Sequence, residues 1–214
     1  MGHSLIHRGL AKKIFTENTI SAFRYCFKKK YGIETDIHHT KDNKIVCFHD
    51  FNLKAKFKIN KYLKNINYKD LLIISKEKKK TIPLLNDLIK LSKDRRFLMI
   101  EIKPLFTKEN LKVLLKETKY LKNYSLTSFK EKNIMNLYKM KKNLNLGLVV
   151  PSTFTNQRII EKSKKKYVKF LVLEKKFLGE QKLNKIKKKI YFYTIKDKKL
   201  FNKFKNKNLI FENL

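Results

Sequence analysis

Short apolar runs alternate with amphipathic helical patterns along most of the 214-residue chain. Runs of about four to eight apolar and β-branched residues indicate strands, whereas apolar residues repeating every three or four positions indicate helices. Strands that alternate with helices predict repeated βαβ units and a parallel sheet. We therefore expect strands at Ser4–His7, Ile33–His39, Phe97–Lys103, Tyr124–Ser128, Leu146–Val150, Phe170–Leu173, Tyr191–Ile195 and Leu209–Phe211, and helices at about 19–30, 84–94, 108–121, 130–142, 155–166, 180–189 and 197–205.

Eight strands in this arrangement predict a compact (β/α)8 TIM barrel, with an open doubly wound sheet as the alternative. Seven helices fit the pattern and the chain stops three residues after the last expected strand, so the last helix of the barrel is expected to be lacking. Because no Pro- or Gly-rich linker divides the sequence, we expect one domain over residues 1–214. Asn18 is the expected N-cap of the first helix.

A β-hairpin is expected to extend the barrel after its second strand. A second apolar run, Ile45–His49, follows the first one after five polar residues, and Asp42-Asn43 is a credible two-residue turn. With that turn, Thr40 would pair with Ile45 and Asp36 with His49, which sets His49 beside Asp36 on one face. A slip of one residue would turn His49 to the other face.

The chain is strongly basic, with 53 Lys and Arg against 18 Asp and Glu and a formal net charge of +35. A nucleic-acid ligand would favour Arg, whereas only five basic residues are Arg and the lysines are spread in short runs. We interpret the lysines as solvated helix faces, with a functional positive field as the alternative. The two cysteines show no metal-ligand spacing, and no stretch is long and apolar enough to cross a membrane, which predicts a cytoplasmic protein.

Polar residues interrupt the apolar pattern where three expected strands end. Strand periodicity places Glu34 and Asp36 on one face of the second strand, with Glu101 and Lys103 on one face of the third. The first strand ends in His7-Arg8-Gly9. In a (β/α)8 barrel, the carboxyl ends of the strands converge on one mouth, where the active site lies.

These residue types point to metal-assisted phosphoryl chemistry. Three carboxylates, Glu34, Asp36 and Glu101, make an all-oxygen site that suits Mg²⁺ or Ca²⁺ rather than zinc. His7 and His49 are candidates for a general acid and base, and Arg8 and Lys103 for the groups that hold a phosphate. Taken singly, each residue is also typical of a satisfied polar group at a strand end.

The order of the motifs resembles the glycerophosphodiester phosphodiesterase family, within the phospholipase C-like phosphodiesterase superfamily. The resemblance is dense from residue 6 to about 104, and it rests on His7-Arg8-Gly9, Glu17-Asn18-Thr19, Glu34-Thr35-Asp36, Thr40-Lys41-Asp42, His49-Asp50, Ile82-Pro83-Leu84 and Glu101-Ile102-Lys103. It implies hydrolysis of a glycerophosphodiester to glycerol 3-phosphate and an alcohol. It also implies attack by the vicinal glycerol hydroxyl, followed by opening of a cyclic phosphate by water.

The resemblance also implies roles for the residues singled out above. Glu34, Asp36 and Glu101 would bind the divalent cation, His7 and His49 would exchange protons, and Arg8 and Lys103 would hold the phosphate. Asp50 would support its loop, while His38 and His39 are left out of the catalytic set. Two departures lie near the substrate: Tyr191-Phe192-Tyr193 stands where members often carry a Trp, and the last strand reads LIFENL instead of a Gly/Asp-rich stretch.

Two other functions are weighed against this one. A lysophospholipase D-like member of the same superfamily would use the basic surface for peripheral contact with an anionic membrane. A noncatalytic nucleic-acid-binding protein is suggested by charge alone, because no aromatic stacking platform or groove-reading motif is evident. We expect a small-molecule glycerophosphodiester as the partner and no nucleic acid; the sequence leaves open the alcohol, the choice between Mg²⁺ and Ca²⁺, and the oligomeric state.

Overall fold

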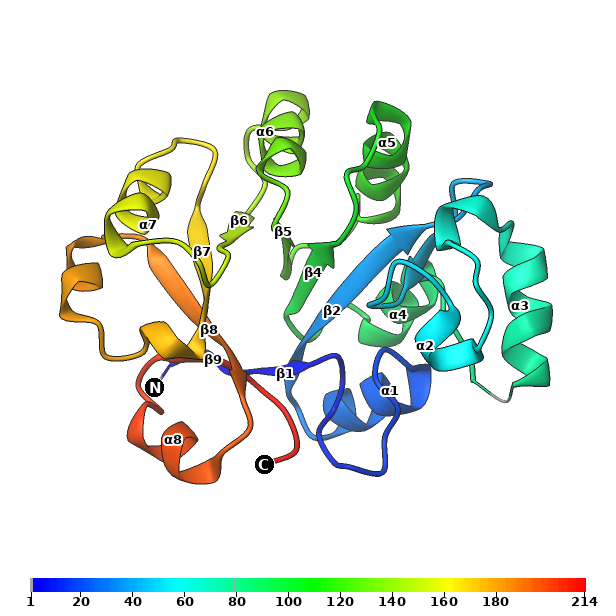
Figure 1. Ribbon diagram of the computed structural model, residues 1–214, viewed down its shortest axis with the longest axis horizontal. Coiled ribbons are helices and arrows are strands. Elements are labelled where there is room, and N and C mark those ends of the chain that lie inside the picture. Colours follow the sequence, from blue (N-terminus) through cyan, green and yellow to red (C-terminus); the bar gives the residue numbers. More distant parts are fainter. Residues whose placement is uncertain (1, 79) are drawn as a thin grey trace.

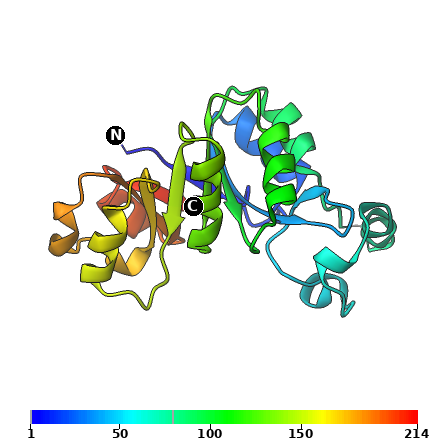
Figure 2. The same ribbon diagram turned by 90° about the horizontal axis from the view of Figure 1, so that it is seen from above.

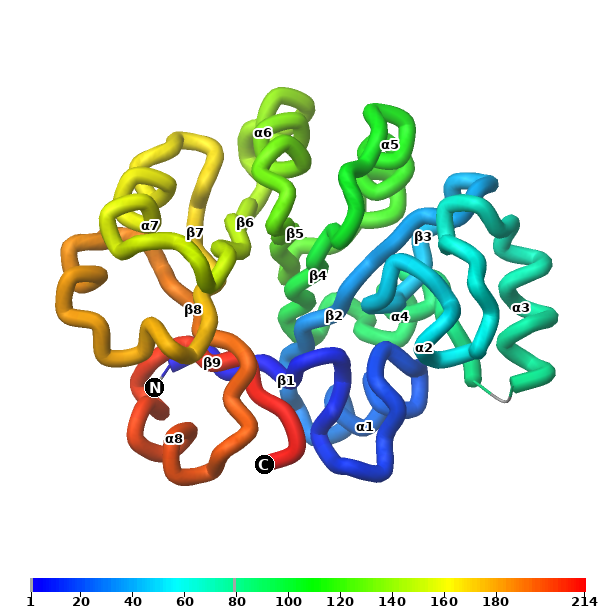
Figure 3. Tube along the Cα trace, viewed as in Figure 1, coloured from blue at the N-terminus to red at the C-terminus, as the bar shows by residue number. Residues whose placement is uncertain are grey.

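The computed structural model describes residues 2–78 and 80–214, and within them eight parallel strands close into a barrel (Figure 1). Neighbouring strands pair in the order β1-β9-β8-β7-β6-β5-β4-β2, and β2 pairs with β1 to complete the circle. Figure 3 shows β9 returning to lie beside β1. The predicted barrel is confirmed, with strands at β1 (Leu5–His7), β2 (Gly32–His39), β4 (Leu98–Ile102), β5 (Tyr124–Ser128), β6 (Leu146–Val149), β7 (Phe170–Glu174), β8 (Lys189–Ile195) and β9 (Asn208–Phe211).

Helices connect consecutive strands and cover the outside of the barrel (Figure 1). Several begin at a side chain that accepts a backbone N–H of the first turn: Thr107 accepts from Asn110, and Asp197 accepts from Leu200. The helices α2 and α3 lie on the side of the barrel away from the last strands (Figure 2). The bounds are α1 (Ile20–Lys28), α2 (Lys54–Phe57), α3 (Tyr68–Glu77), α4 (Leu85–Ser92), α5 (Lys108–Glu117), α6 (Glu131–Met140), α7 (Asn156–Ser163) and α8 (Lys198–Lys203).

The helix expected at 180–189 is wrong. This connection contains two 3-10 helices, η2 (Lys175–Phe177) and η3 (Gln181–Lys185), and β8 already begins at Lys189. Gly179 between the 3-10 helices has φ +85°, a conformation that ends helical structure. On a continuing helix, Lys188 and Lys189 would lie three and four residues after Lys185, where like charges repel.

Apolar side chains form two layers on the two faces of the barrel sheet. Along β7, Leu171 and Leu173 pack with the residues of the helices, whereas Phe170 and Val172 pack inside the barrel. The barrel interior is filled by Leu5, Met99, Val149, Phe170, Val172, Tyr191 and Ile210. This filling closes the barrel along its axis, so any binding site must lie at one of its two ends. No helix in the described part of the chain is long and apolar enough to cross a membrane.

The expected hairpin is present, but its register differs by one residue from the prediction. The strand β3 (Ile45–Cys47) runs antiparallel to β2, with His39 opposite Ile45 and His38 opposite Val46. The loop has three residues instead of two, because Asn43 adopts a left-handed conformation (φ 58°) and the Thr40 hydroxyl accepts the N–H of Lys44 at 3.0 Å. The predicted pairings of Thr40 with Ile45 and of Asp36 with His49 are therefore wrong.

Candidate active site

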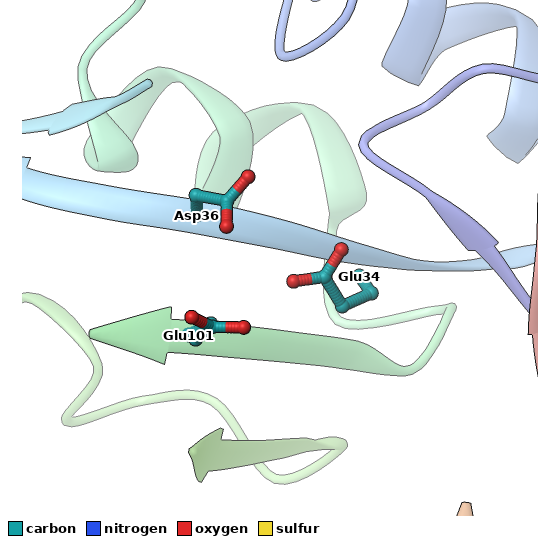
Figure 4. Close-up of side chains that lie close together, drawn as sticks. All are labelled: Glu34, Asp36 and Glu101. Atoms are coloured by element: carbon teal, nitrogen blue, oxygen red, sulfur yellow. The ribbon is translucent and has the colours of Figure 1, made fainter. Parts of the chain in front are cut away.

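The three predicted metal-ligating carboxylates lie together on two neighbouring strands. Asp36 of β2 is directly opposite Glu101 of β4, and Glu34 precedes Asp36 by two residues on the same face. One oxygen from each carboxylate lies within 4.8 Å of the others. Figure 4 shows the three side chains approaching one another from these strands. They are almost fully buried, with exposed fractions of 4% for Glu34, 1% for Asp36 and 9% for Glu101.

Two cations compensate part of this buried negative charge. The Arg8 Nε lies 2.8 Å from Asp36 Oδ2, and the Lys103 Nζ lies 2.8 Å from Glu101 Oε1 and 3.4 Å from Asp36 Oδ1. Burial favours the neutral form of Asp36, but Arg8 and Lys103 outweigh it and lower the pKa of this carboxyl. The same contacts raise the pKa of Lys103 against the effect of burial. Asp36 is therefore the ionised centre of the cluster.

At the other two carboxylates, Glu34 and Glu101, the nearby positive charge does not offset the effect of burial. Burial and the neighbouring carboxylates raise the pKa of Glu34 well above its ordinary value, and the pKa of Glu101 to about 7. Among the residues that the structure describes, Glu34 Oε2 is buried without a hydrogen-bond partner. A buried carboxylate oxygen without a partner, within reach of two further carboxylates, fits a hard divalent cation, because Mg²⁺ and Ca²⁺ are held by oxygen ligands. The residues present therefore fit the expected metal.

His7 ends β1 and points into the same region. Its Nδ1 lies 2.6 Å from Glu212 Oε2, and its Nε2 lies 3.9 Å from Glu34 Oε2. An ionised carboxylate only accepts hydrogen bonds, so Nδ1 carries the proton and Nε2 is left toward the carboxylate cluster. The hydrogen bond from His7 and a second one from Lys196 lower the pKa of Glu212 to about 2, although burial opposes them. Glu212 is thus ionised and fixes the orientation of the imidazole.

His49 reaches the site by a route that differs from the predicted one. It lies two residues beyond the end of β3, where the chain has left the ladder, so the alternation of faces no longer decides its direction. Its Nδ1 lies 2.8 Å from Asp50 Oδ1. Burial lowers the pKa of His49, and Arg8 and Lys103 act in the same direction against Asp36. Both candidate histidines therefore have a carboxylate at Nδ1.

One cavity collects the predicted residues at the carboxyl ends of the strands. It has a volume of about 190 Å³. Apart from Asp36, which lies behind Arg8, every predicted site residue lines it: His7, Arg8, Glu34, His49, Glu101 and Lys103. Apolar and aromatic groups complete the wall, among them Phe129 and Tyr193, whose rings meet edge to face at 6.3 Å. Tyr193 belongs to the stretch that the sequence analysis marks as a departure from the resemblance.

A polar network behind the cavity involves residues that the sequence analysis placed elsewhere or left out. Thr19, not Asn18, is the N-cap of α1. Asn18 instead donates to Asp36 Oδ2 at 3.2 Å and accepts from the Thr35 hydroxyl at 2.8 Å. Glu17 pairs with Arg8 at 2.9 Å and with Lys56. The predicted cap is therefore wrong, and Asn18 supports the central carboxylate.

Glu212 is the main site residue that the sequence analysis missed. It directly follows β9, so it lies at the same end of the barrel as the other site residues. The rule that functional groups gather at the carboxyl ends of barrel strands would have selected it. LIFENL lacks the expected Gly/Asp-rich ending, but its single acidic residue stands at the required position.

Comparisons with known proteins identify the family and the fold. The sequence model of the glycerophosphoryl diester phosphodiesterase family matches residues 7–211. A curated glycerophosphodiester phosphodiesterase from Caldanaerobacter subterraneus is 28% identical over 159 residues, which cover 68% of this chain and 65% of that relative. The match thus spans slightly less than two thirds of the relative's length.

Solved structures share the fold over nearly the whole chain. A glycerophosphodiester phosphodiesterase from Thermotoga maritima has a TM-score of 0.83 at 21% identity, covering 100% of this chain and 95% of that one. An Oleispira antarctica phosphodiesterase in complex with the product sn-glycerol-3-phosphate has a TM-score of 0.81 at 20% identity, covering 100% and 93%. Since the family's sequence model extends from the first candidate histidine to the last strand, this chain belongs to the glycerophosphoryl diester phosphodiesterase family.

Proposed function

We propose that this protein hydrolyses glycerophosphodiesters to glycerol 3-phosphate and an alcohol, with the help of a divalent cation. The observation that carries the proposal is the convergence of three carboxylates, two basic side chains and two histidines around one cavity. Family membership supports it, and the Oleispira structure contains the product that this reaction would release.

We assign the cation to Glu34, Asp36 and Glu101. The oxygen ligands favour Mg²⁺ or Ca²⁺ and do not choose between them. When bound, such an ion would neutralise part of the charge of the phosphodiester and polarise its phosphoryl oxygens. Binding would also relieve the repulsion among the three carboxylates, of which Glu34 has the least compensation.

Arg8 and Lys103 are assigned to the phosphate of the substrate. The guanidinium of Arg8 has five N–H donors in a planar fork, and it contacts Asp36 through Nε and Glu17 through a terminal nitrogen. Both cations line the cavity and remain charged, because neighbouring carboxylates raise the pKa of each against the effect of burial. They would hold the phosphate and stabilise the charge that develops on its oxygens.

His7 and His49 are assigned to proton transfer. Each has a carboxylate at Nδ1, so Nε2 is the nitrogen available to a substrate. One imidazole would accept the proton of the attacking hydroxyl, and the other would donate a proton to the oxygen of the departing alcohol. In the second step, the hydrolysis of a cyclic phosphate, the two would exchange roles: one would accept a proton from water and the other would donate a proton to the ring oxygen that leaves phosphorus.

The attacking group is proposed to be the glycerol hydroxyl next to the phosphoester. Its oxygen forms a bond to phosphorus while the bond to the alcohol oxygen breaks, which gives a five-membered cyclic phosphate. Water then opens the ring and gives glycerol 3-phosphate. Because the nucleophile is tethered to the phosphate, the site needs no nucleophilic side chain. This agrees with a cavity lined by imidazoles and carboxylates.

A substrate panel tests the proposal. Purified protein is assayed with glycerophosphocholine, glycerophosphoethanolamine and a lysophospholipid, each with excess chelator, Mg²⁺ or Ca²⁺. Release of glycerol 3-phosphate that requires a divalent cation supports the proposal. Turnover of the lysophospholipid alone would move the assignment to the lysophospholipase D-like alternative, and no turnover of any diester would refute both.

A second experiment tests the attacking group. The analogue of glycerophosphocholine that lacks the vicinal hydroxyl should inhibit hydrolysis of the parent diester but react far more slowly. If the analogue is cleaved as fast as the parent compound, water attacks phosphorus directly, and the cyclic intermediate must be abandoned.

A further inference from the structure

A second cavity lies at the opposite end of the barrel. It has a volume of about 520 Å³ and is lined where the strands begin: Gly32 opens β2, Phe97 precedes β4, and Lys189 opens β8. Most barrel strands contribute to it, so it is the mouth at the amino ends of the strands. The filled barrel interior, which includes Met99 and Val149, separates it from the candidate active site. Nothing in the proposed reaction uses this cavity.

Basic side chains surround this cavity: Lys30, Arg95, Arg96, Lys169 and Lys189. In the described part of the chain, none of their side chains forms an ion pair or a hydrogen bond with another residue. No Asp or Glu is among the lining residues. Positive charges that line a cavity raise the local electrostatic potential, because the concave walls focus the electric field. Burial lowers the pKa of His3, another lining residue, and the nearby Lys189 ammonium acts in the same direction.

The abundance of lysine explains only part of this gathering. Lys and Arg together number 53, so several lysines around a cavity are expected in this chain and do not by themselves indicate a binding site. Arginine is scarce in this chain, however, and two of its five copies, Arg95 and Arg96, line the same cavity side by side. A planar guanidinium can donate two parallel hydrogen bonds to a phosphate group, which a lysine cannot do.

The backbone around the two arginines is held in place. Lys93 and Asp94 both adopt left-handed conformations (φ 47° and 53°), an uncommon arrangement for residues other than glycine. The Asp94 carboxylate accepts the N–H groups of Lys122 and Asn123 at 3.1 and 2.9 Å. The acidic group nearest in sequence is thus engaged with the loop before β5, and the same bonds tie Arg95 and Arg96 to the rim that Asn123 also lines.

The floor and the remaining rim of the cavity are suited to a small molecule. Phe97, Phe170 and Tyr191 supply aromatic surface, and Asn123 and Asn145 supply amide groups. A volume of about 520 Å³ is within the range of about 300–1,000 Å³ that is typical of small-ligand sites. A single phosphate would leave most of five positive charges uncompensated, because it carries only about 1.5 to 2 negative charges near neutral pH.

We propose that the mouth at the amino ends of the barrel strands binds a small molecule with two or more linked phosphate groups. The arginine pair would hold adjacent phosphates, while Lys169 and Lys189 would compensate the remaining charge from the facing rim. A nucleoside polyphosphate and an inorganic polyphosphate share this chemistry. This proposal does not depend on the proposed hydrolysis, because the two sites share no residue.

Calorimetric titration tests the proposal directly. Sodium tripolyphosphate, ATP and orthophosphate are titrated in turn into the whole protein, with excess chelator and an ionic strength of about 0.15 M to weaken nonspecific attraction. We expect saturable binding of one tripolyphosphate or ATP per chain, and much weaker binding of orthophosphate. Tighter binding of ATP than of tripolyphosphate would identify a nucleotide as the natural form, and equal binding would identify the phosphate chain itself.

Three double variants locate the site. Arg95→Ala/Arg96→Ala and Lys169→Ala/Lys189→Ala remove charge from its two sides, and each should weaken tripolyphosphate binding by at least about tenfold. Arg24→Ala/Arg158→Ala removes two exposed arginines elsewhere and should leave the affinity nearly unchanged. Thermal unfolding checks each variant: tripolyphosphate should raise the midpoint of the wild type and the control. The two site variants are independent, so failure of one to fold leaves the other as the test.

Three results would overturn the proposal. One is the absence of saturable tripolyphosphate binding to the wild type. Another is an equal loss of affinity in the Arg24/Arg158 control. The third is tighter binding of a single-stranded oligoribonucleotide, with a steep salt dependence and no response to either pair of site substitutions, because this would indicate a diffuse nucleic-acid surface.

Discussion

At the carboxyl ends of the barrel strands, the lining cations Arg8 and Lys103 are paired with carboxylates, and the cavity is small. At the amino ends, the cavity is larger and its lining cations form no ion pair within the described residues. The first end has buried negative charge in excess of its cations, with Glu34 the least compensated, and the second has positive charge alone. The carboxyl end is therefore suited to a divalent cation together with a phosphodiester, and the amino end to an anion alone, a difference that the net charge of +35 would not suggest.

Removal of divalent cations should give the largest effect. Chelator is expected to abolish turnover, and Mg²⁺ or Ca²⁺ to restore it, because Glu34, Asp36 and Glu101 repel one another without a cation. The effective ion should also stabilise the folded protein, by about 2.7 kcal/mol at an ion concentration of 100 times its dissociation constant. The midpoint of thermal unfolding should rise accordingly.

A matched variant distinguishes this site from nonspecific effects of salt. Glu34→Gln should lose the ion-dependent shift in the unfolding midpoint but keep the shift caused by tripolyphosphate. Full turnover in excess chelator would show that the reaction needs no divalent cation at the carboxylate cluster. The proposed difference between the ligands of the two ends would then be wrong.

Replacement of the histidines should have the next largest effect. His7→Ala and His49→Ala are each expected to lower turnover by at least about 10²-fold, because each removes a proton-transfer group. His39→Gln is the control, since that ring packs against Phe106 outside the cavity. Steady-state kinetics and circular dichroism separate loss of activity from loss of fold. Near-normal turnover of a variant would show that the replaced histidine does not transfer a proton in the reaction.

The barrel could be predicted from the sequence because strands buried on both faces are continuous apolar runs, which contrast with the three- to four-residue repeat of the helices. The carboxylate cluster followed from the alternation of side chains along a strand, since Asp36 and Glu101 lie in paired strands. Where the chain departs from regular structure, the prediction failed. The conformation of Asn43 changed the hairpin register, and Glu212 acts on His7 through a contact between the two ends of the sequence. The position of Glu212 at a strand end could be read from the sequence, but local patterns specify neither its contact with His7 nor the conformation of Asn43.

Exchange of the carboxylates behind the histidines should have a smaller, graded effect. Glu212→Gln is expected to lower turnover by about 10- to 100-fold, because an amide can present a donor to His7 Nδ1 and stabilise the other tautomer. Asp50→Asn should cost less, since the Asp50 side chain is 28% exposed against 8% for Glu212 and water can replace part of its contact. A larger loss from Asp50→Asn would reverse this ranking, and Glu212→Asp tests rescue by a shorter carboxylate.

The smallest effect concerns Glu117 at the end of α5, outside both cavities. Burial raises the pKa of this carboxyl to about 7, with Lys44 opposing and Asp87 reinforcing the shift. The folded protein therefore holds a proton that the unfolded chain releases near the ordinary value of 4.5. Stability from this group is present below that value and is lost as the pH rises through about 7.

Glu117→Gln should therefore flatten the pH dependence of the unfolding midpoint between about pH 5 and 8. Metal-free wild type and variant are compared by thermal unfolding, which leaves the two ends of the barrel the same in both. Parallel curves for the two proteins would show that Glu117 ionises normally in the folded state.

The hydrogen bond between His7 and Glu212 joins residues 205 positions apart. It can form only after the final strand has docked against the first, and contacts of such high sequence separation are among the last that a chain gains on folding. A partly synthesised or partly refolded barrel would contain most of its strands and helices but would have an unoriented imidazole. Catalytic competence should thus appear in the slowest phase of refolding, after helical content has returned, and it would report on closure of the barrel rather than on its assembly.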